Sequence, residues 1–381
     1  MRGAAVLGAA LGLLWLATTA SRAQEAAPPK PDPEVSRITL HVKDAKLTDV
    51  LKEFAKQSGN RLVYPPDDWD GRAVSLDVKD LPYWEAMEEL CRKTSCLYEP
   101  VPKFGERSGL TLTRVAKMLE PAGYTGPAVF RVVQATGYRD FRPLPDEPRT
   151  TVQLEYQLVY YWEDRLPVLG TRVRWKQATT PEGGGMPLGY DDPLLPIRRY
   201  YRDGTTCPQG YAELAFWPRA EAVKHPGTVE GTLTVALARG AKKEIVVEDV
   251  LGEGEKSATE GNITLTTTKV ANDQEKGFTV TLLTKPLIDG QPAGERLPIM
   301  HSTGEYGVFL VDPHGERHRP QLLQQKLIEN ENGLLREPWD RFHLTFTNLP
   351  RLEGKWSAVC VYPEEMVVRT YEIELTNLPI P

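Results

Sequence analysis

The chain has 381 residues, with 46 lysines and arginines against 52 aspartates and glutamates, so its formal net charge is −6. An acidic chain is not built to follow phosphate backbones or anionic lipid by bulk charge, so nucleic acid is not an expected partner. A chain of this length is too long for one ordinary core, and two or three domains are expected.

The first 23 residues have the layout of a secretory signal peptide. Arg2 supplies the positive start, residues 4–20 are apolar, and Ser21-Arg22-Ala23 fits a small-x-small cleavage rule. Cleavage is therefore expected near Ala23, with a periplasmic or secreted product. The alternative is a retained membrane anchor, but this apolar run is shorter than the roughly 20 residues that a span needs. No later stretch is long and apolar enough to cross a bilayer, so no integral span is expected after cleavage.

Four cysteines suggest two disulfide bridges in an oxidising compartment, and three connectivities are possible. They are Cys91, Cys96, Cys207 and Cys360. Proximity favours a bridge from Cys91 to Cys96, which would leave Cys207 to pair with Cys360. Buried free thiols remain the alternative, because spacing alone cannot exclude them.

Residues 24–36 hold four prolines and little apolar material, so they are expected to form an extended linker. The alternation in 37–42 then predicts a strand. A helix is expected from about Lys46, since Leu47, Val50, Leu51 and Phe54 recur at the spacing of a buried stripe. Gly59 is placed to end it in a left-handed backbone conformation.

The same pattern is repeated further along the chain. Residues 74–78 alternate as a strand, Pro82 suits a first helical turn, and a second stripe contains Trp84, Met87, Leu90 and Cys91. Residues 97–101 and 110–115 are expected to form a closing hairpin. The prediction is a small α+β module, 37–115, with two helices on one face of a small sheet.

This module resembles the short N-terminal domain of secretins and TonB-dependent receptors. The resemblance rests on "ITLHVKDAKLTDVLKEFAKQSG" followed by "VSLDVKDLPYWEAMEEL", and it covers under a quarter of the chain. In that family the domain makes protein contacts in the periplasm, so the resemblance implies a contact with one or more envelope proteins here. The rest of the chain departs from both parent families, which continue into a pore domain or a long barrel. A recycled folding unit without a partner remains the alternative, because a fold alone does not fix function.

From Pro127 onward helical periodicity is nearly absent, and β-branched and aromatic runs alternate with turn residues. Two antiparallel β-sandwich domains are expected, at 126–222 and 223–381. The expected strands are 128–133, 151–161, 168–177, 231–238, 244–249, 262–270, 278–284, 306–311, 343–347, 356–362 and 367–375. This part loosely resembles uncharacterised exported proteins of the planctomycete type, on "GTLTVALARGAKKEIVVEDVL", "GVFLVDPHGERHRP" and "YEIELTNLPIP". No activity follows from that resemblance.

Reactive motifs are scarce. His314 and His318 are the best metal candidates, but Pro313 and Gly315 favour a turn over a site, which needs three or more convergent ligands. The neighbouring acids are expected to be solvated turns; they are Asp67, Asp68, Asp70, Asp191, Asp192, Glu364 and Glu365. The chain has no GxSxG, HExxH, GxxxxGK[ST] or strand-following GxGxxG motif. No catalytic residue, metal ligand or cofactor is predicted.

An aromatic group raises one further possibility. Tyr156, Tyr160 and Trp162 share a strand face and could stack on sugar rings if exposed, although their mixture with leucines favours a core. The sequence therefore predicts a non-catalytic exported envelope protein whose module and sandwiches make protein contacts. A carbohydrate-binding or carbohydrate-processing accessory protein is the alternative, and a hydrolase with an unfamiliar site is a third. The partner's identity and the oligomeric state are not predicted.

Overall fold

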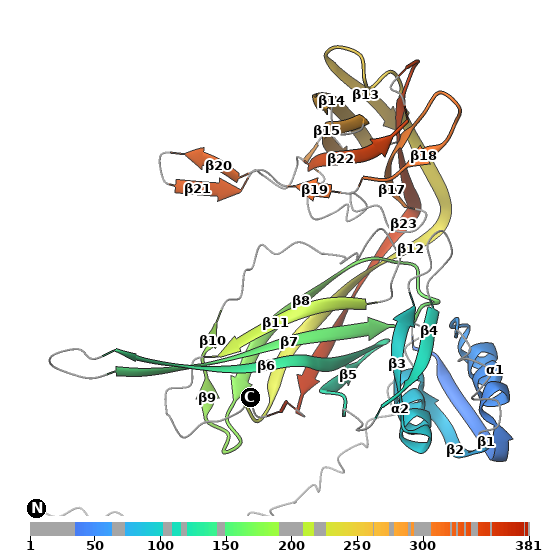
Figure 1. Ribbon diagram of the computed structural model, residues 1–381, viewed down its shortest axis with the longest axis vertical. Coiled ribbons are helices and arrows are strands. Elements are labelled where there is room, and N and C mark those ends of the chain that lie inside the picture. Colours follow the sequence, from blue (N-terminus) through green and yellow to red (C-terminus); the bar gives the residue numbers. More distant parts are fainter. Residues whose placement is uncertain are drawn as a thin grey trace, which may run out of the picture. The chain divides into compact units, whose positions relative to one another are not determined.

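The computed structural model shows a mostly β protein with two helices (Figure 1). The signal peptide, the linker as far as residue 34, and Cys207 lie outside the residues that the structure describes. The described residues are 35–62, 73–101, 109–115, 120–142, 149–189, 209–216, 226–261, 263–273, 278–288, 291–292, 306–320, 322–324, 327–330, 333–336, 342–350, 353–376 and 378–379.

The N-terminal part alternates strands and helices. Its elements are β1 (Arg37–Lys46), α1 (Leu47–Ser58), β2 (Ala73–Pro82), α2 (Tyr83–Thr94), β3 (Cys96–Val101) and β4 (Gly109–Arg114). The apolar stripe of α1 is buried as its spacing predicts, and the helix ends at Gly59 with a φ of 71°. β1 pairs with β2 and β3 with β4, both antiparallel. We call residues 35–115 the helical module.

The core of the helical module continues into a neighbouring sheet. Val129, Val159 and Tyr161 belong to the same buried cluster as the residues of α1 and α2. They lie on β6 (Ala128–Arg142) and β7 (Arg149–Trp162), which form one long hairpin. Val159 and Tyr161 of β7 face the module, and the even-numbered residues from Leu154 to Trp162 face another core. The end of β7, residues 158–162, is therefore buried on both faces, whereas Gln157 is exposed.

Three larger antiparallel sheets follow (Figure 1). The first has the order β10-β11-β7-β6-β5, with β5 (Gly123–Thr125), β10 (Leu188–Gly189) and β11 (Gln209–Phe216). The second has the order β18-β17-β23-β12-β8-β9, with β8 (Val168–Thr179), β9 (Gly185–Met186), β12 (Val229–Val247), β17 (Gly307–Val311), β18 (Arg317–His318) and β23 (Ser357–Leu375). The third has the order β13-β14-β15-β22-β19, with β16 beside β15. Its strands are β13 (Glu255–Glu260), β14 (Ile263–Asp273), β15 (Phe278–Ile288), β16 (Gln291–Pro292), β19 (Leu322–Gln324) and β22 (Phe342–Leu349), and β20 (Leu327–Asn330) pairs separately with β21 (Gly333–Arg336).

β12 and β23 are each 19 residues long and run side by side (Figure 1). The sequence predicted two strands in each place, with breaks at Arg239–Lys243 and Pro363–Met366, and this prediction is wrong. The register shifts between Arg239 and Lys242, where Gly240 has a φ of 73°, so the apparent turn is a β-bulge inside a continuous strand. An extra residue at a bulge kinks a strand without ending it.

Two hydrophobic cores lie along these long strands. Leu233, Val235 and Leu237 of β12 pack with Trp162 and Phe216 in the first core. In a second core, Ala238, Ile245 and Val247 of the same strand pack with Phe346 and Trp356. Even-numbered Ala238 and odd-numbered Ile245 face the same core because the bulge between them adds one residue. The predicted boundary between 222 and 223 lies outside the described residues, and strand pairing runs across it, since β8 pairs with β12.

The predicted bridge between Cys91 and Cys96 is not formed. Both are buried free thiols, as is Cys360. Cys91 lies in the last turn of α2, whereas the Cys96 thiol hydrogen-bonds the Thr94 carbonyl at 3.2 Å. Burial raises the pKa of Cys360 to about 12 and also raises that of Cys91. These thiols are therefore core side chains.

Candidate functional site

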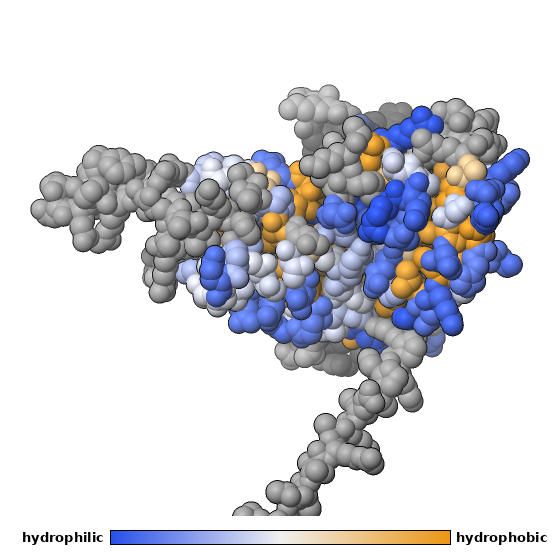
Figure 2. Space-filling view, turned by 90° about the horizontal axis from the view of Figure 1, so that it is seen from below, coloured by the Kyte–Doolittle hydropathy of each residue, from blue (hydrophilic) through white to orange (hydrophobic). Residues whose placement is uncertain are grey.

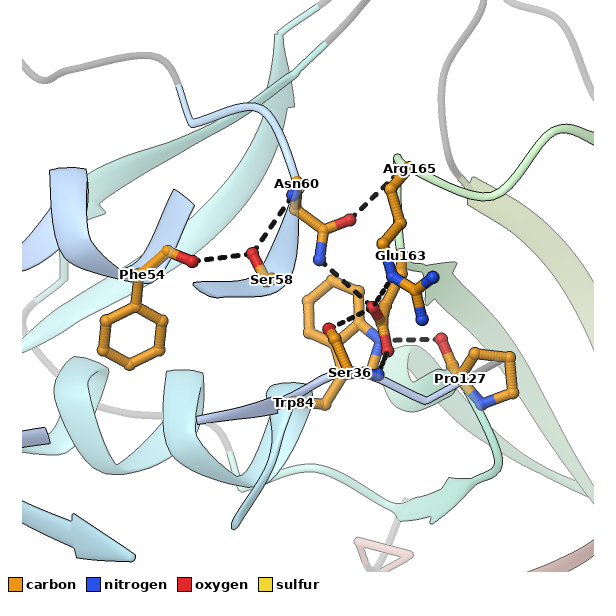
Figure 3. Close-up of polar contacts among 8 residues, drawn as sticks. All are labelled: Ser36, Phe54, Ser58, Asn60, Trp84, Pro127, Glu163 and Arg165. Carbon is orange, nitrogen blue, oxygen red and sulfur yellow. Dashed lines mark hydrogen bonds and ion pairs between the residues drawn. The ribbon is translucent and has the colours of Figure 1, made fainter. Parts of the chain in front are cut away.

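A buried glutamate stands where the helical module meets the first sheet. Glu163 follows the last residue of β7 and is fully buried. Its carboxylate accepts hydrogen bonds from the backbone N–H of Ser36 at 2.9 Å and from the Ser36 hydroxyl (Figure 3). Asn60 donates from Nδ2 at 3.2 Å, and Arg165 donates from Nε at 2.8 Å. Four donors from three segments therefore converge on one carboxylate.

The end of α1 positions Asn60 in this junction. Ser58 donates its hydroxyl to the Phe54 carbonyl at 2.7 Å, and the same oxygen accepts the Asn60 N–H at 3.1 Å. Asn60 then accepts the backbone N–H of Arg165 through Oδ1 at 3.0 Å, while its amide nitrogen reaches Glu163. This buried asparagine thus joins the helix end to the turn after β7 with both of its polar atoms.

Trp84 joins α2 to the turn between β5 and β6, next to Glu163. The Trp84 indole N–H donates to the Pro127 carbonyl at 2.9 Å, and the same carbonyl accepts the Glu163 N–H at 3.2 Å. The Tyr83 N–H donates to the Ser36 carbonyl at 2.8 Å. Figure 3 shows Ser36, Asn60, Trp84 and Arg165 gathered around Glu163. We call these contacts together the Glu163 junction.

A second buried ion pair lies between α2 and β6. Arg131 pairs with Glu88, and both side chains are at most 4% exposed. Arg131 also donates from Nε to the Tyr98 hydroxyl at 2.9 Å and lies over the Tyr98 ring, 4.6 Å from its centroid. Burial raises the pKa of Tyr98 well above its ordinary value.

Both carboxylates make contacts that hold the helical module against the first sheet. A general acid or base must reach a substrate atom, whereas Glu163 is surrounded by its own donors and shielded from solvent. A buried ion pair also gives geometric specificity, because misplacing either partner leaves an uncompensated charge. The arrangement fixes the helical module on β6 and β7.

The predicted aromatic ligands lie in the core. Tyr156, Tyr160 and Trp162 are each at most 2% exposed and pack in the first core. Tyr156 donates its hydroxyl to the Pro379 carbonyl at 3.0 Å, and burial raises its pKa to about 12. Rings buried in this way have no face open to a sugar. These three residues are therefore core side chains, as their mixture with leucines favoured.

The remaining candidates are dispersed. His314 is exposed in the turn after β17, while His318 is on β18, and the two do not converge. His318 instead lies 3.6 Å from the Asp312 carboxylate. Burial acts to raise the pKa of Asp312, but backbone hydrogen bonds from Glu316 and His314 and the neighbouring His318 lower it overall. Glu364 and Glu365 are exposed as expected, but they lie inside the continuous strand β23 and not in a turn, and Glu364 accepts the Ala241 N–H at 3.2 Å. The other predicted acidic turns, at 67–70 and 191–192, lie outside the described residues.

Sequence reasoning missed Glu163, Glu88 and Arg131. One signal was available for Glu88, which lies four residues after Trp84 and therefore inside the apolar stripe of α2. Glu163 directly follows a run that is apolar on both faces, so a buried charge there could have been suspected. Two of its donor residues, Ser36 and Asn60, lie 127 and 103 residues away, and no sequence pattern links them to Glu163.

The fold and the junction define a mostly antiparallel β protein with a two-helix module held on its first sheet by buried carboxylates. Comparison with known protein families, curated protein sequences and solved structures finds no match. Neither helix in the described part of the chain has the length and apolarity to cross a bilayer.

Proposed function

We propose that the protein is an exported, non-catalytic scaffold of the cell envelope that presents its helical module to another protein. The observation that supports this proposal is the two-sided character of the module. One side is fixed to β6 and β7 through the Glu163 junction, the Arg131–Glu88 pair and a shared core. A rigidly held module needs little ordering when a partner binds its other side, which favours affinity.

The outer face of β1 and β2 is the surface we assign to the partner. The two strands alternate, with apolar side chains inward and exposed Thr39, His41, Ser75, Asp77 and Lys79 outward. The face carries both charges and hydroxyl groups, the kinds of side chain that form the polar rim of a non-obligate protein interface. Figure 2 shows another view of the molecule, in which hydrophilic residues cover most of the described surface and hydrophobic residues show between them.

The signal-peptide pattern in residues 1–23 supports the proposed export to the periplasm or the exterior. The resemblance of 37–115 to the short N-terminal domain of secretins and TonB-dependent receptors supports a protein partner. The sugar-binding alternative required an exposed aromatic face, and Tyr156, Tyr160 and Trp162 are buried, so we do not propose it.

Site-specific photo-crosslinking in the native envelope tests the proposal. A photoreactive amino acid at Lys79 or His41, on the outer face, is expected to give one shared adduct of defined mass. Ser257, an exposed position on β13, is the matched control and is expected to lack that adduct. No adduct at Lys79 and His41, or the same adduct from Ser257, would contradict the assigned surface.

A further inference from the structure

A cluster of metal-ligating side chains lies at the turn between β17 and β18, far in the sequence from the helical module. Asp312, Glu316 and His318 each offer one ligand atom, and these atoms lie within 4.8 Å of one another. We propose that these three residues form a binding site for a divalent transition-metal ion of the zinc type. The proposal is independent of the function proposed above.

The turn holds Asp312 in one orientation. One carboxylate oxygen, Oδ1, accepts the backbone N–H groups of His314 and Glu316, each at 2.8 Å. The Asp312 N–H donates to the Glu316 carbonyl at 3.0 Å, and Gly315 adopts a φ of 88° that closes the turn. The second oxygen, Oδ2, is thereby left facing His318 at 3.6 Å from Nε2.

The surroundings of His318 supply a second observation. Its Nε2 atom is buried and has no hydrogen-bond partner, although its ring packs on Trp356 with centroids 5.5 Å apart. Buried polar atoms almost always have a partner, so an unmatched imidazole nitrogen aimed at a carboxylate calls for an explanation. Coordination of a cation between Nε2 and Oδ2 would satisfy both atoms.

The local charges fit a divalent cation. Within the described part of the chain, no lysine or arginine pairs with Asp312 or Glu316. The neighbouring Arg317 is bound to both carboxylate oxygens of Glu244, at 2.8 and 2.9 Å. Two carboxylates would neutralise a doubly charged ion, and the imidazole favours a transition metal over calcium or magnesium.

The geometry needs only a small adjustment. Bonds of about 2.0–2.2 Å in a tetrahedral site place ligand atoms on the order of 3.4 Å apart. The 3.6 Å separation of Nε2 and Oδ2 is already close to that value. Glu316 is exposed, so its side chain can rotate inward to become the third ligand. Water would take the fourth position.

Isothermal titration of residues 24–381, freed of metal and of any affinity tag, with zinc chloride tests the proposal. We expect one equivalent of zinc to bind, and His318→Gln and Glu316→Gln each to weaken binding at least tenfold. His314→Gln is the matched control, because it makes the same change at an exposed histidine outside the cluster. Zinc is also expected to shift the His318 ring nitrogen resonances, whereas calcium is not.

Absence of stoichiometric zinc binding to the wild type would overturn the proposal, and would leave His318 simply paired with Asp312. Equal weakening by His314→Gln would also overturn it. Circular dichroism checks that each variant is folded. If His318→Gln unfolds, the exposed position of Glu316 keeps Glu316→Gln informative.

Discussion

Replacing Glu163 by glutamine should loosen the attachment of the helical module while leaving the two β cores intact. The substitution preserves shape but removes the charge and turns one acceptor oxygen into an amide donor. Oε1 accepts the Ser36 N–H, while Oε2 accepts from the Ser36 hydroxyl, Asn60 and Arg165. Whichever way the amide is oriented, its NH₂ group faces at least one of these donors.

The expected loss of stability at the junction follows from placing an amide NH₂ group against a hydrogen-bond donor. Leaving one buried donor unsatisfied costs about 1–3 kcal/mol. Loss of the charge-assisted bond from Arg165 adds about 1 kcal/mol, a reduced figure because the Arg165 side chain is 26% exposed and can turn to solvent. The sum is about 2–4 kcal/mol, below the roughly 3–5 kcal/mol for breaking a fully buried pair.

Native-state hydrogen exchange followed by mass spectrometry is the assay, because a multi-core chain need not unfold in two states. Peptides from 35–62 and around Glu163 should exchange faster by about 30-fold to 700-fold, at about 1.4 kcal/mol per factor of ten. Peptides from β14 and β15 should not change. Glu182→Gln, in an exposed turn after β8, is the matched control and should leave every peptide unchanged.

An increase of less than about fivefold in the exchange of 35–62 would refute the proposed role of Glu163 in holding the module, because it corresponds to under about 1 kcal/mol. An equal increase across all peptides would also refute it, since the variant would then be lowering global stability. Only selective acceleration in the helical module and at its docking turn fits the contacts seen in Figure 3.

Three further outcomes follow. Arg131→Met should lower stability by about 3–5 kcal/mol because Glu88 loses its counter-ion, and adding Glu88→Leu should restore part of the loss; thermal melts in which the double variant is no better would contradict this. Trp84→Phe should lower the free energy of unfolding by about 1–3 kcal/mol, measured by the same thermal melts. The loss should lie towards the lower end, because the Pro127 carbonyl that loses the indole still accepts the Glu163 N–H. Cys91 and Cys360 should resist alkylation in the native protein and react once it is denatured without reductant; a Cys91 that stays silent until reduction would indicate a bridge.

Local patterns predicted the local elements well. The stripe of α1 and its end at Gly59 follow from residue spacing and from the glycine's access to a left-handed backbone. The long strands were harder. Gly240 and Pro363 look like turn residues, and only the pairing of β12 with β23 shows that both positions are absorbed within paired strands. A bulge and a turn use the same residue types, so the sequence alone does not separate them.

The candidate site was less predictable because its contacts are non-local. Ser36 and Glu163 are 127 residues apart, and Asn60 and Glu163 are 103 apart. One indirect signal was present in β7, where Tyr160, Tyr161 and Trp162 place aromatic rings on both faces of the strand. A strand that is apolar on both faces is covered on both sides. That pattern is compatible with burial on both faces at this end of β7, but it does not indicate which segment provides the second cover.

The shared core constrains how the helical module can work. Releasing it from β6 and β7 would expose Trp84, Tyr161 and Val159 to water and would strip Glu88 of its counter-ion. Both changes raise the free energy of the chain, so only a small fraction of molecules should have the module separated from β6 and β7. An isolated fragment ending at residue 115 would carry that apolar surface permanently and could retain unrelated proteins. The docked module in the intact chain is therefore the form in which the proposed partner should be sought, and its outer strand face is a surface that docking leaves exposed.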